Sequence, residues 1–444
     1  MKIIATILIL LCPAFLQAQI VVSGAHVYVG GNQPFISNQV ITIENGEITS
    51  VSDKAPHTLT SDIKVIECKG CYVVPGIIEM HGHLPTREYK GKEVDDLLAL
   101  FVTHGVTTVR SVLGGPAQLD LLERIEKEKI LAPDFIMAGP GFSGGNTKSV
   151  EEAVARIEEY ARQGWQLVKV YNGLTIEVYN AIIKTAKVHN MPVIGHVPMA
   201  VGLDRVLNAG QQTIEHLDGY LEGGAGEYRL LTSKELNLLA HKTRDAKVGI
   251  VPTMKVWEVI LKTASLDELM QTKGLEYVSN ELLENWIDGY ELPIIAEVKV
   301  FLKKLLGEYD VDILVENRRK LLGAMQRAGV KIYFGTDSPQ TFSVAGASVV
   351  PEMLEMQASG MSPAQVIESA TVNAGSLLSP YFKVGQVKAG YEADLIILKN
   401  NPLKDLRAFE DPAGIIINGY YLSEATIRET LQSIKLRAAA NYID

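Results

Sequence analysis

The pattern of hydrophobic and polar positions changes twice along the chain. Between residues 20 and 74, short apolar runs alternate with polar residues and are separated by Gly, Asn, Asp and Pro, without a helical period. Asn45-Gly46 lies between two of these runs, which is a strong signal for a β-hairpin. The pattern predicts β structure here and indicates half of a small β-sandwich.

From residue 73 to about residue 380, strand-like apolar runs alternate with amphipathic segments of helical length. The eight strand candidates are 73–80, 107–112, 134–138, 167–171, 193–197, 213–217, 248–252 and 332–336. Eight β/α repeats predict a closed (β/α)8 TIM barrel, in which catalytic residues lie at the carboxyl ends of the strands.

The connection before the eighth strand is longer than the others. Residues 254–330 are helix-rich and contain Trp257, Trp286, Tyr290 and Tyr309. An insertion at this place would overhang the barrel mouth, so it is a candidate for a lid or a substrate pocket. Extra helical packing explains the same pattern equally well.

After residue 380 the β pattern returns in the runs 393–398 and 415–419, and a closing helix is expected at about 423–438. We expect these strands to complete the N-terminal sandwich. The predicted α/β organisation is a signal peptide, a sandwich made from both chain ends, and a metallohydrolase barrel between them: residues 1–18, 19–74 with 381–444, and 75–380.

The first residues have the three parts of a secretory signal. Met1-Lys2 precedes an apolar run to Leu11, which is too short to span a bilayer, and a small residue, Ala18, stands at its end. We expect cleavage after Ala18 and a periplasmic or secreted product that has no membrane contact once the signal is removed.

Two cysteines remain after this cleavage, in the sequence Cys68-Lys69-Gly70-Cys71. In an exported chain such a pair favours a disulfide, and Lys69-Gly70 is typical of a hairpin turn. We expect a disulfide across this turn.

Composition narrows the class of partner. The chain has 444 residues, of which 47% are hydrophobic and 21% are charged, as in an ordinary soluble enzyme. Its net charge of −10 and the lack of a basic run argue against nucleic acid as a partner. A small-molecule substrate is expected, and a homo-oligomer is left open.

Residues 75 to 83, Pro-Gly-Ile-Ile-Glu-Met-His-Gly-His, carry the first candidate chemistry. In an extended chain His81 and His83 point to the same side, with Gly82 between them. Imidazole is a common ligand for zinc and similar ions, so the pair predicts part of a metal site.

Further ligand types stand at the ends of later predicted strands. These candidates are Lys169 in the fourth strand, His196 in the fifth, His216 in the sixth and Asp337 after the eighth. Each alone is also explained as a core histidine, a pocket lysine or a helix cap. Because all of them would meet His81 and His83 at one face of one barrel, we interpret the six residues together as a metal site.

These motifs resemble the amidohydrolase superfamily, in particular its imidazolonepropionase-like and Xaa-Pro dipeptidase (prolidase)-like branch. Pro75 to His83 fits Pro-Gly-x-x-Asp-x-His-x-His, with Glu79 in place of Asp. Further matches cover nearly the whole mature chain: Gly105 to Arg110, Ile214 to His216, Gly335 to Ser338, Thr371 to Ala374, and Gly390 to Leu395.

The resemblance implies two divalent metal ions, expected to be zinc, bridged by a carbamate on Lys169. It implies that His81, His83 and Asp337 hold one ion and that His196 and His216 hold the other. A hydroxide shared by the two ions would attack the substrate, and Asp337 would act as general base and then as general acid.

Three residues are candidate substrate contacts. Tyr171 should face the same side as Lys169, Tyr220 lies just beyond His216, and Arg110 is a candidate partner for a substrate carboxylate. Packing at the barrel rim is an equally good explanation for the two tyrosines.

The expected function is that of an exported, binuclear metal-dependent amidohydrolase that cleaves an amide bond in a dipeptide of the Xaa-Pro kind or in an N-acyl amino acid. A mononuclear deaminase or cyclic-amide hydrolase is one alternative, against which Lys169 counts. Hydrolysis of lactones or organophosphate esters is a second alternative, and a solute-binding barrel without catalysis is the third.

Overall fold

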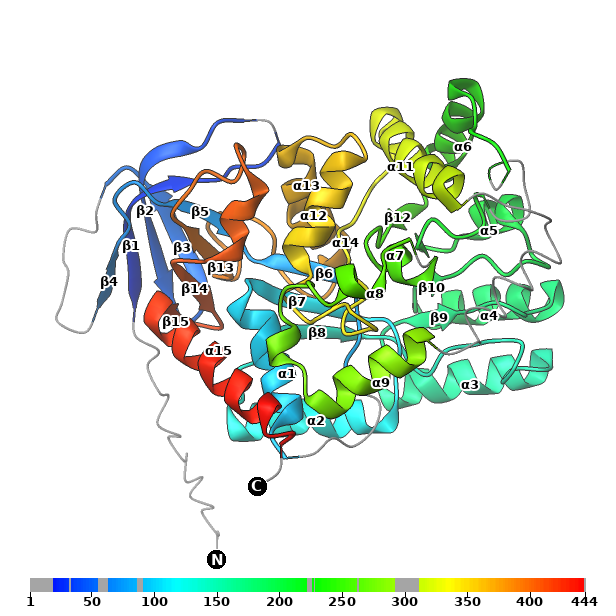
Figure 1. The fold of residues 1–444 in the computed structure, drawn as a ribbon, viewed down its shortest axis with the longest axis horizontal. Helices are drawn as coiled ribbons and strands as arrows, with labels where there is room; N and C mark the ends of the chain where they lie inside the picture. The colour runs from blue at the N-terminus through cyan, green and yellow to red at the C-terminus, as the bar shows by residue number, and fades with distance from the viewer. Residues whose placement is uncertain are drawn as a thin grey trace, which may run out of the picture.

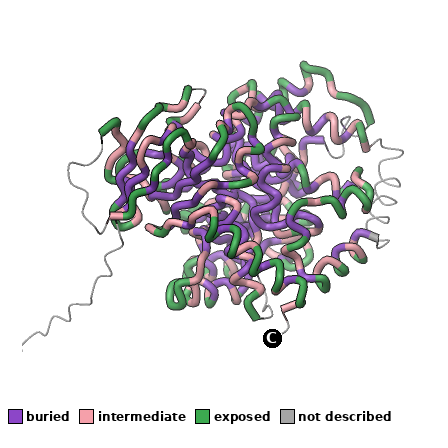
Figure 2. The backbone as a smooth tube through the Cα atoms, turned by 60° about the vertical axis from the view of Figure 1, so that its left-hand side comes forward, coloured by how far each residue is buried: buried purple, intermediate pink, exposed green. Residues whose placement is uncertain are grey.

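The computed structural model describes residues 19–31, 33–54, 63–85, 91–221, 226, 228–261, 263–291 and 311–442. The predicted signal peptide lies outside the described residues. Figure 1 shows a β-sheet at one side of the molecule and a larger body of strands and helices beside it. Buried residues gather along the strands, and exposed residues follow the outer turns of the helices (Figure 2).

Strands from both ends of the chain form one eight-stranded sheet in the order β15-β14-β13-β5-β1-β2-β3, with β4 also paired to β1. Their bounds are β1 Ile20–Val27, β2 Ile36–Glu44, β3 Glu47–Ser52, β4 Lys64–Glu67, β5 Tyr72–Pro75, β13 Leu395–Leu398, β14 Gly414–Ile417 and β15 Tyr420–Ser423. The antiparallel pairing of β13 with β5 joins the two chain ends. A two-layer sandwich is not confirmed, because the described strands pair within this single sheet. The domain limits stay a prediction.

Alternation along the strands gives this sheet two apolar faces. In β14, Ile416 packs with Ile41 and Leu395 on one face. Its neighbours Ile415 and Ile417 instead pack against the helices of the other face. The sheet is therefore fixed to the rest of the molecule through that second face.

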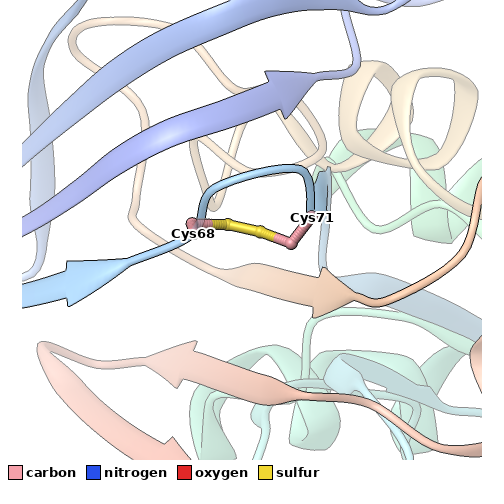
Figure 3. Close-up of a disulfide and its surroundings, with 2 residues drawn as sticks. All are labelled: Cys68 and Cys71. Atoms are coloured by element: carbon pink, nitrogen blue, oxygen red, sulfur yellow. A yellow bond between two sulfur atoms is a disulfide. The ribbon is translucent and has the colours of Figure 1, made fainter.

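The segment between β4 and β5 is a turn, but it does not form the predicted hairpin. Both strands run parallel to β1, with Ile20 opposite Lys64 and His26 opposite Tyr72, so the chain continues in the same direction after the turn. Cys68 and Cys71, whose Cα atoms lie 5.2 Å apart, form a disulfide across it (Figure 3). The Cys71 amide also donates to the Cys68 carbonyl.

Two parallel sheets lie at the centre of the larger body, in the orders β6-β7-β8 and β12-β11-β10-β9. Their bounds are β6 Ile77–Gly82, β7 Val106–Ser111, β8 Asp134–Met137, β9 Val168–Val170, β10 Val193–Gly195, β11 Thr213–Glu215 and β12 Gly249–Val251. Every residue of β6, β7, β9, β10, β11 and β12 is buried, as expected for parallel strands covered on both faces.

Isolated contacts link the edges of these two sheets. Ala138 bridges to Leu167, which connects β8 to β9, and Ile332 bridges to Ile250 of β12. The Met80 amide donates to the Phe334 carbonyl, so residues 332–337 also reach β6. The arrangement is TIM-barrel-like, although the regular strand ladders of the described residues do not run continuously around it.

We call the eight-stranded sheet the mixed sheet, because it has parallel and antiparallel pairs, and the part built on the two parallel sheets the barrel-like body. The predicted first strand is divided at Gly76 between these two parts. The Gly76 amide donates to the Asp394 carbonyl at 2.7 Å. A Cβ atom at residue 76 would lie 2.1 Å from Thr107 Oγ1, so only glycine fits. The sequence pattern predicted one strand because the apolar run continues through this crossing point.

The helices follow the strands in order. They are α1 Glu93–Thr103, α2 Pro116–Glu128, α3 Val150–Gln163, α4 Ile176–Val188, α5 Leu203–Ala209, α6 Ser233–Ala246, α7 Val256–Ile260, α8 Leu266–Leu269, α9 Asn280–Glu291, α11 Val311–Ala328, α12 Val349–Ala358, α13 Pro363–Ala370, α14 Val372–Leu378 and α15 Glu424–Ala439, with 3-10 helices at Leu275–Tyr277 and Leu406–Glu410. Within the described part of the chain, the structure contains no helix whose length and hydrophobicity would let it cross a membrane.

The predicted insertion packs against the segment that follows Asp337. Trp286 and Tyr290 of α9 contact Phe342, with ring centroids 5.9 and 6.2 Å apart. Arg318 of α11 places its guanidinium 3.9 Å from the ring centroid of Trp257 and donates to the His216 carbonyl. The insertion is therefore built into the wall beside the candidate site, and Tyr309 lies outside the described residues.

Candidate metal centre

The two histidines of the first motif end β6, where Gly82 separates them. Their ring centroids lie 5.5 Å apart. His81 is 1% exposed, and its Nδ1 lies 2.6 Å from Glu215 Oε2. His83 Nε2 lies 2.6 Å from Asp337 Oδ1. A Cβ atom at residue 82 would lie 2.7 Å from Val109 Cγ1, so glycine lets the two imidazoles stand so close to β7.

Asp337 reaches the same space from the end of the eighth predicted strand. Its amide donates to the His81 carbonyl at 2.9 Å, and its Oδ1 lies 3.4 Å from His81 Nε2. Burial raises the pKa of the Asp337 carboxyl, but the charge that His81 and His83 carry when protonated, together with the hydrogen bond to His83, lowers it more, so the net shift is downward. Asp337 is therefore a carboxylate at neutral pH.

His196 and His216 follow β10 and β11 and complete the histidine set. Their ring centroids lie 4.9 Å apart, and the His216 ring lies 4.5 Å from the His81 ring. Burial lowers the pKa of His216 well below its ordinary value, and the charges of His81 and His196 would lower it further. Burial does the same to His81. Both are neutral imidazoles, which is the form that binds a metal ion.

Lys169 lies in the middle of β9 and is 1% exposed. Burial lowers the pKa of its ammonium to about 8, although the Glu215 and Asp337 carboxylates act in the opposite direction. Roughly one lysine in ten would then be a neutral amine at pH 7, a few hundred-fold more than for a lysine in water. A neutral amine is the form that reacts with carbon dioxide.

Three polar partners orient the imidazoles from behind. Glu215 accepts from His81 Nδ1, Asp218 Oδ2 lies 3.2 Å from His196 Nδ1, and Thr253 Oγ1 lies 2.7 Å from His216 Nδ1. With Nδ1 engaged in this way, the Nε2 atom of each ring is left as the ligand atom. The sequence predicts no role for these partners, because each of them contacts an imidazole that belongs to a different strand.

The backbone is unusual at several of these positions. Asp337, His216 and Thr253 have φ angles of +62°, +63° and +41°. Residues other than glycine rarely adopt such angles, and they do so mostly where a functional site requires a particular side-chain direction. His216 and Thr253 stand just after β11 and β12, and Asp337 follows the segment 332–336, which makes an isolated bridge to β12.

Glu79 is a second buried acid below the histidines. Its Oε1 accepts from the His81 and Thr336 amides, both at 2.9 Å, and its Oε2 accepts from Thr336 Oγ1 at 2.7 Å. Burial raises the pKa of Glu79 to about 7. Glu79 thus ties the end of β6 to residues 332–337, the segment that carries Asp337.

The structure places Arg110 and Tyr220 away from the role of substrate contacts. Arg110 is fully buried and donates to the Met80 carbonyl, to Thr213 Oγ1 and to Glu215 Oε1. Its guanidinium is buried among the strands and pairs with Glu215, the residue that hydrogen-bonds His81. The Tyr220 hydroxyl lies 2.7 Å from Thr243 Oγ1 and is buried. Neither side chain is presented to the histidine cluster.

Tyr171 keeps its place beside the site. Its ring stacks on His196 at 5.1 Å between centroids, and Lys169 Nζ lies 5.3 Å from the same ring. It is only partly buried. Tyr171 is therefore the predicted substrate contact that the geometry supports.

The residues fit a metal ion. One ligand atom from each of His81, His216 and Asp337 lies within 4.8 Å of the other two, and all three residues are buried. Nitrogen and carboxylate oxygen ligands on neutral imidazoles and an ionised acid suit zinc or a similar divalent ion. The division of the ligands between two ions, and the carbamate, stay predictions.

Asp218→Asn is expected to weaken metal binding by about 10–100-fold, because the amide no longer holds His196 in the required tautomer by charge. The measurement is the metal dissociation constant in a competition titration with a chromophoric chelator. Asp204→Asn is the matched control, since Asp204 pairs only with Lys242 at the surface, with a side chain that is 75% exposed. Equal affinities in the two variants would contradict this role of Asp218.

Gly335→Ala is expected to destabilise the fold by about 1–3 kcal/mol and to displace His81, because the added Cβ would lie 2.9 Å from His81 Cβ and 2.6 Å from Val251 Cγ1. Urea unfolding measures the change. Gly289→Ala in α9 is the control, because nothing lies within 4 Å of its added Cβ, and alanine favours a helix by roughly 0.5–1 kcal/mol. A Gly335→Ala variant as stable as the wild type would show that residues 332–337 are not held against β6 as described.

The fold and this cluster define a class, a TIM-barrel-like protein with a histidine, aspartate and lysine centre at one end of its parallel strands. Residues 72–421 match the amidohydrolase family, and the chain belongs to that family. The predicted superfamily, a family of hydrolases, is thereby confirmed.

Among curated proteins, the chain is similar to the ochratoxinase of Aspergillus niger, with 23% identity over 295 residues. The match covers 62% of this chain and 50% of that protein, so the chain spans about half the length of the curated relatives it matches.

Solved structures with a similar fold include three amide-hydrolase relatives. A Xaa-Pro dipeptidase with methionine bound in its active site matches with a TM-score of 0.69 and 20% identity, over 91% of this chain and 100% of that one. A bottromycin amidohydrolase matches with a TM-score of 0.72 and 21% identity, over 95% and 91%. The A. niger ochratoxinase matches with a TM-score of 0.64 and 17% identity, over 91% and 95%. At these identities the likeness concerns the fold.

Proposed function

We propose that this chain is an exported, binuclear metal-dependent amidohydrolase that cleaves an amide bond in a small substrate, a dipeptide of the Xaa-Pro kind or an N-acyl amino acid. The observation that carries the proposal is the convergence of His81, His216 and Asp337 within one buried space, with Lys169 in the neighbouring strand.

The donor set supports two divalent ions. When bound, such ions polarise the scissile carbonyl and lower the pKa of an attacking water. The neutral Lys169 amine would attack carbon dioxide, forming an N–C bond and losing one proton, so that a carboxylate replaces an ammonium. This change removes a positive charge from a space in which His81 and His216 are already neutral.

In this proposal Asp337 moves the proton. Its carboxylate is ionised and is held by His83 at 2.6 Å. As the water oxygen bonds to the carbonyl carbon, Asp337 accepts the water proton. As the C–N bond breaks, the same proton goes to the leaving nitrogen. Tyr171, beside Lys169 and His196, is the nearest described candidate to hydrogen-bond the substrate.

The substrate class is supported by what the relatives are called, a Xaa-Pro dipeptidase and a bottromycin amidohydrolase among them. Lys169 argues against the mononuclear deaminase alternative, which requires no bridging group. We place the lactone and organophosphate alternatives second because the named relatives act as amidohydrolases or dipeptidases.

The proposal is tested with the full mature chain, first stripped by a chelator and then reconstituted with zinc. A panel of Xaa-Pro dipeptides, N-acyl amino acids, a lactone and a phosphotriester is assayed in both states. We expect turnover of an amide substrate only after reconstitution, with about two metal ions per chain. Full activity in the stripped protein, or turnover of the ester substrates alone, would overturn the proposal.

Export is part of the same proposal and rests on the sequence of residues 1–18. The Cys68–Cys71 disulfide agrees with an oxidising compartment. N-terminal sequencing of protein from its native host should give a chain that starts at Gln19. An intact Met1 would refute export by this signal.

A further inference from the structure

A second cluster of acidic side chains lies where the mixed sheet meets the opposite end of the parallel strands. It contains Asp134, Glu392 and Asp394, and one carboxylate oxygen of each lies within 4.8 Å of the other two. Asp134 is the first residue of β8, and Asp394 directly precedes β13. Because parallel strands place their amino ends together, this cluster is far from the histidine centre at the carboxyl ends.

One buried carboxylate oxygen of this cluster, Asp394 Oδ2, has no hydrogen-bond partner among the described residues. Asp394 is 3% exposed, and its Oδ2 atom is buried without a partner. Thr107 is fully buried beside it, and a hydrogen bond from the Thr107 hydroxyl lowers the pKa of the Asp394 carboxyl. An unpartnered buried oxygen is costly, so each such atom in a folded protein requires an explanation.

The β14–β15 hairpin closes over the cluster. Its two-residue turn is Asn418-Gly419, with φ angles of +49° and +76°, the conformation that this sequence favours. The Asn418 side chain hydrogen-bonds Asp134, and the Asn418 backbone hydrogen-bonds Asp394. One turn therefore braces two of the three carboxyl groups from different parts of the fold.

The charged groups that act on Asp134 and Asp394 are other carboxylates, so they add negative charge to the cluster and do not neutralise it. Burial raises the pKa of Asp394 well above its ordinary value, and Asp134 and Glu392 raise it further. Burial and Glu392 raise the pKa of Asp134 to about 6. Like charges so close together must be relieved by a cation or by a shared proton.

We propose that Asp134, Glu392 and Asp394 form a binding site for a calcium ion that fastens the mixed sheet to the barrel-like body. Calcium takes carboxylate, hydroxyl and water oxygens at about 2.3–2.6 Å, so two ligand oxygens on opposite sides of the ion lie about 4.8 Å apart. One oxygen of each carboxyl in the cluster lies within that distance of the other two. Asp134 and Glu392 are partly exposed, which leaves room for water to complete the shell.

A calcium ion would explain both the unpartnered Asp394 Oδ2 and the position of the cluster. Asp134 belongs to the barrel-like body, whereas Asp394 and the Asn418 turn belong to strands of the mixed sheet. A bound ion would therefore add one more link between two parts that already pack together. The site is independent of the hydrolytic chemistry proposed above, so failure of one proposal leaves the other standing.

The test uses the zinc-loaded full mature chain, so that the histidine centre is already filled. Calcium chloride is titrated at pH 8 by isothermal titration calorimetry, and the melting temperature is measured with and without millimolar calcium. We expect one calcium ion per chain and a rise in Tm of at least about 3 °C. Binding should weaken at least about tenfold at pH 5.5, because protons compete for the carboxylates.

The double variant Asp134→Asn with Glu392→Gln should lose both the binding and the rise in Tm. The control is Glu123→Gln with Glu126→Gln, which makes the same change of charge at two exposed positions of α2 and should behave like the wild type. If the double variant does not fold, Glu392→Gln alone should weaken calcium binding about tenfold.

Two results would overturn the proposal. Calcium binding that survives in both cluster variants would place the ion elsewhere. No saturable binding at pH 8, together with a Tm that rises on acidification in the wild type and not in the cluster variants, would show that a shared proton relieves the repulsion.

Discussion

Lys169→Ala is expected to lower kcat for the preferred amide substrate by about 100-fold or more, because a bridging ligand between the two ions is lost. The four histidines and Asp337 would still hold metal, so the metal content should fall less than the rate. Acetate or propionate at high concentration can enter the space vacated by the side chain and should restore part of the activity.

Lys169→Arg is the informative companion variant. The guanidinium would fill the same buried space and keep its positive charge, so small carboxylates should not rescue it. If Lys169 were only a lysine that binds an anionic substrate, the arginine variant would be the more active of the two, and small acids would inhibit. Steady-state rates of both variants with and without acetate, together with the mass of Lys169, which a carbamate would increase by about 44 Da, separate the two roles.

Asp337→Asn is expected to reduce kcat/KM for amide substrates by about 1,000-fold, because the amide group can neither accept the water proton nor return it to the leaving nitrogen. The variant keeps the shape of the side chain, although the contact with His83 Nε2 at 2.6 Å would weaken. An activated ester whose leaving group needs no proton should lose much less activity.

That contrast between amide and ester distinguishes proton transfer from a purely structural role. A variant that lost the same factor on both substrates would have been damaged by loss of metal, and Asp337 would then be a ligand only. Asp218→Asn serves as the comparison, since it should weaken metal binding and so affect both substrates alike at limiting metal. Metal titrations of both variants complete the experiment.

The sequence predicted the ligand set because each of those residues stands beside a strong local signal. His81 and His83 alternate across one glycine, and His216 and Asp337 each follow an apolar run. In parallel strands such positions share one edge, and the structure brings His81, His216 and Asp337 within 4.8 Å. No fact about a distant part of the chain was needed for this prediction.

The roles of Arg110 and Tyr220 could not be predicted in the same way. Local order placed Arg110 near the end of a strand, which suggested a substrate contact, but its guanidinium reaches across to Glu215. Burying an ionised arginine is unfavourable without such a partner, and the partner lies in a strand far along the chain. The pairing of the end strands was also beyond local pattern. Alternation shows that a strand has two faces but not which strands pair, so a two-layer sandwich was predicted where the described strands pair in one sheet.

The sequence by itself therefore determined the order of strands and helices, the family, and the candidate metal ligands, because period, turn residues and ligand types are local properties. The tertiary structure alone decided which polar groups lie behind those ligands: Glu215 behind His81, Asp218 behind His196 and Thr253 behind His216. It alone also brought Asp134, Glu392 and Asp394 together. Such contacts join residues far apart in the chain, and their energies depend on burial, which no local pattern contains.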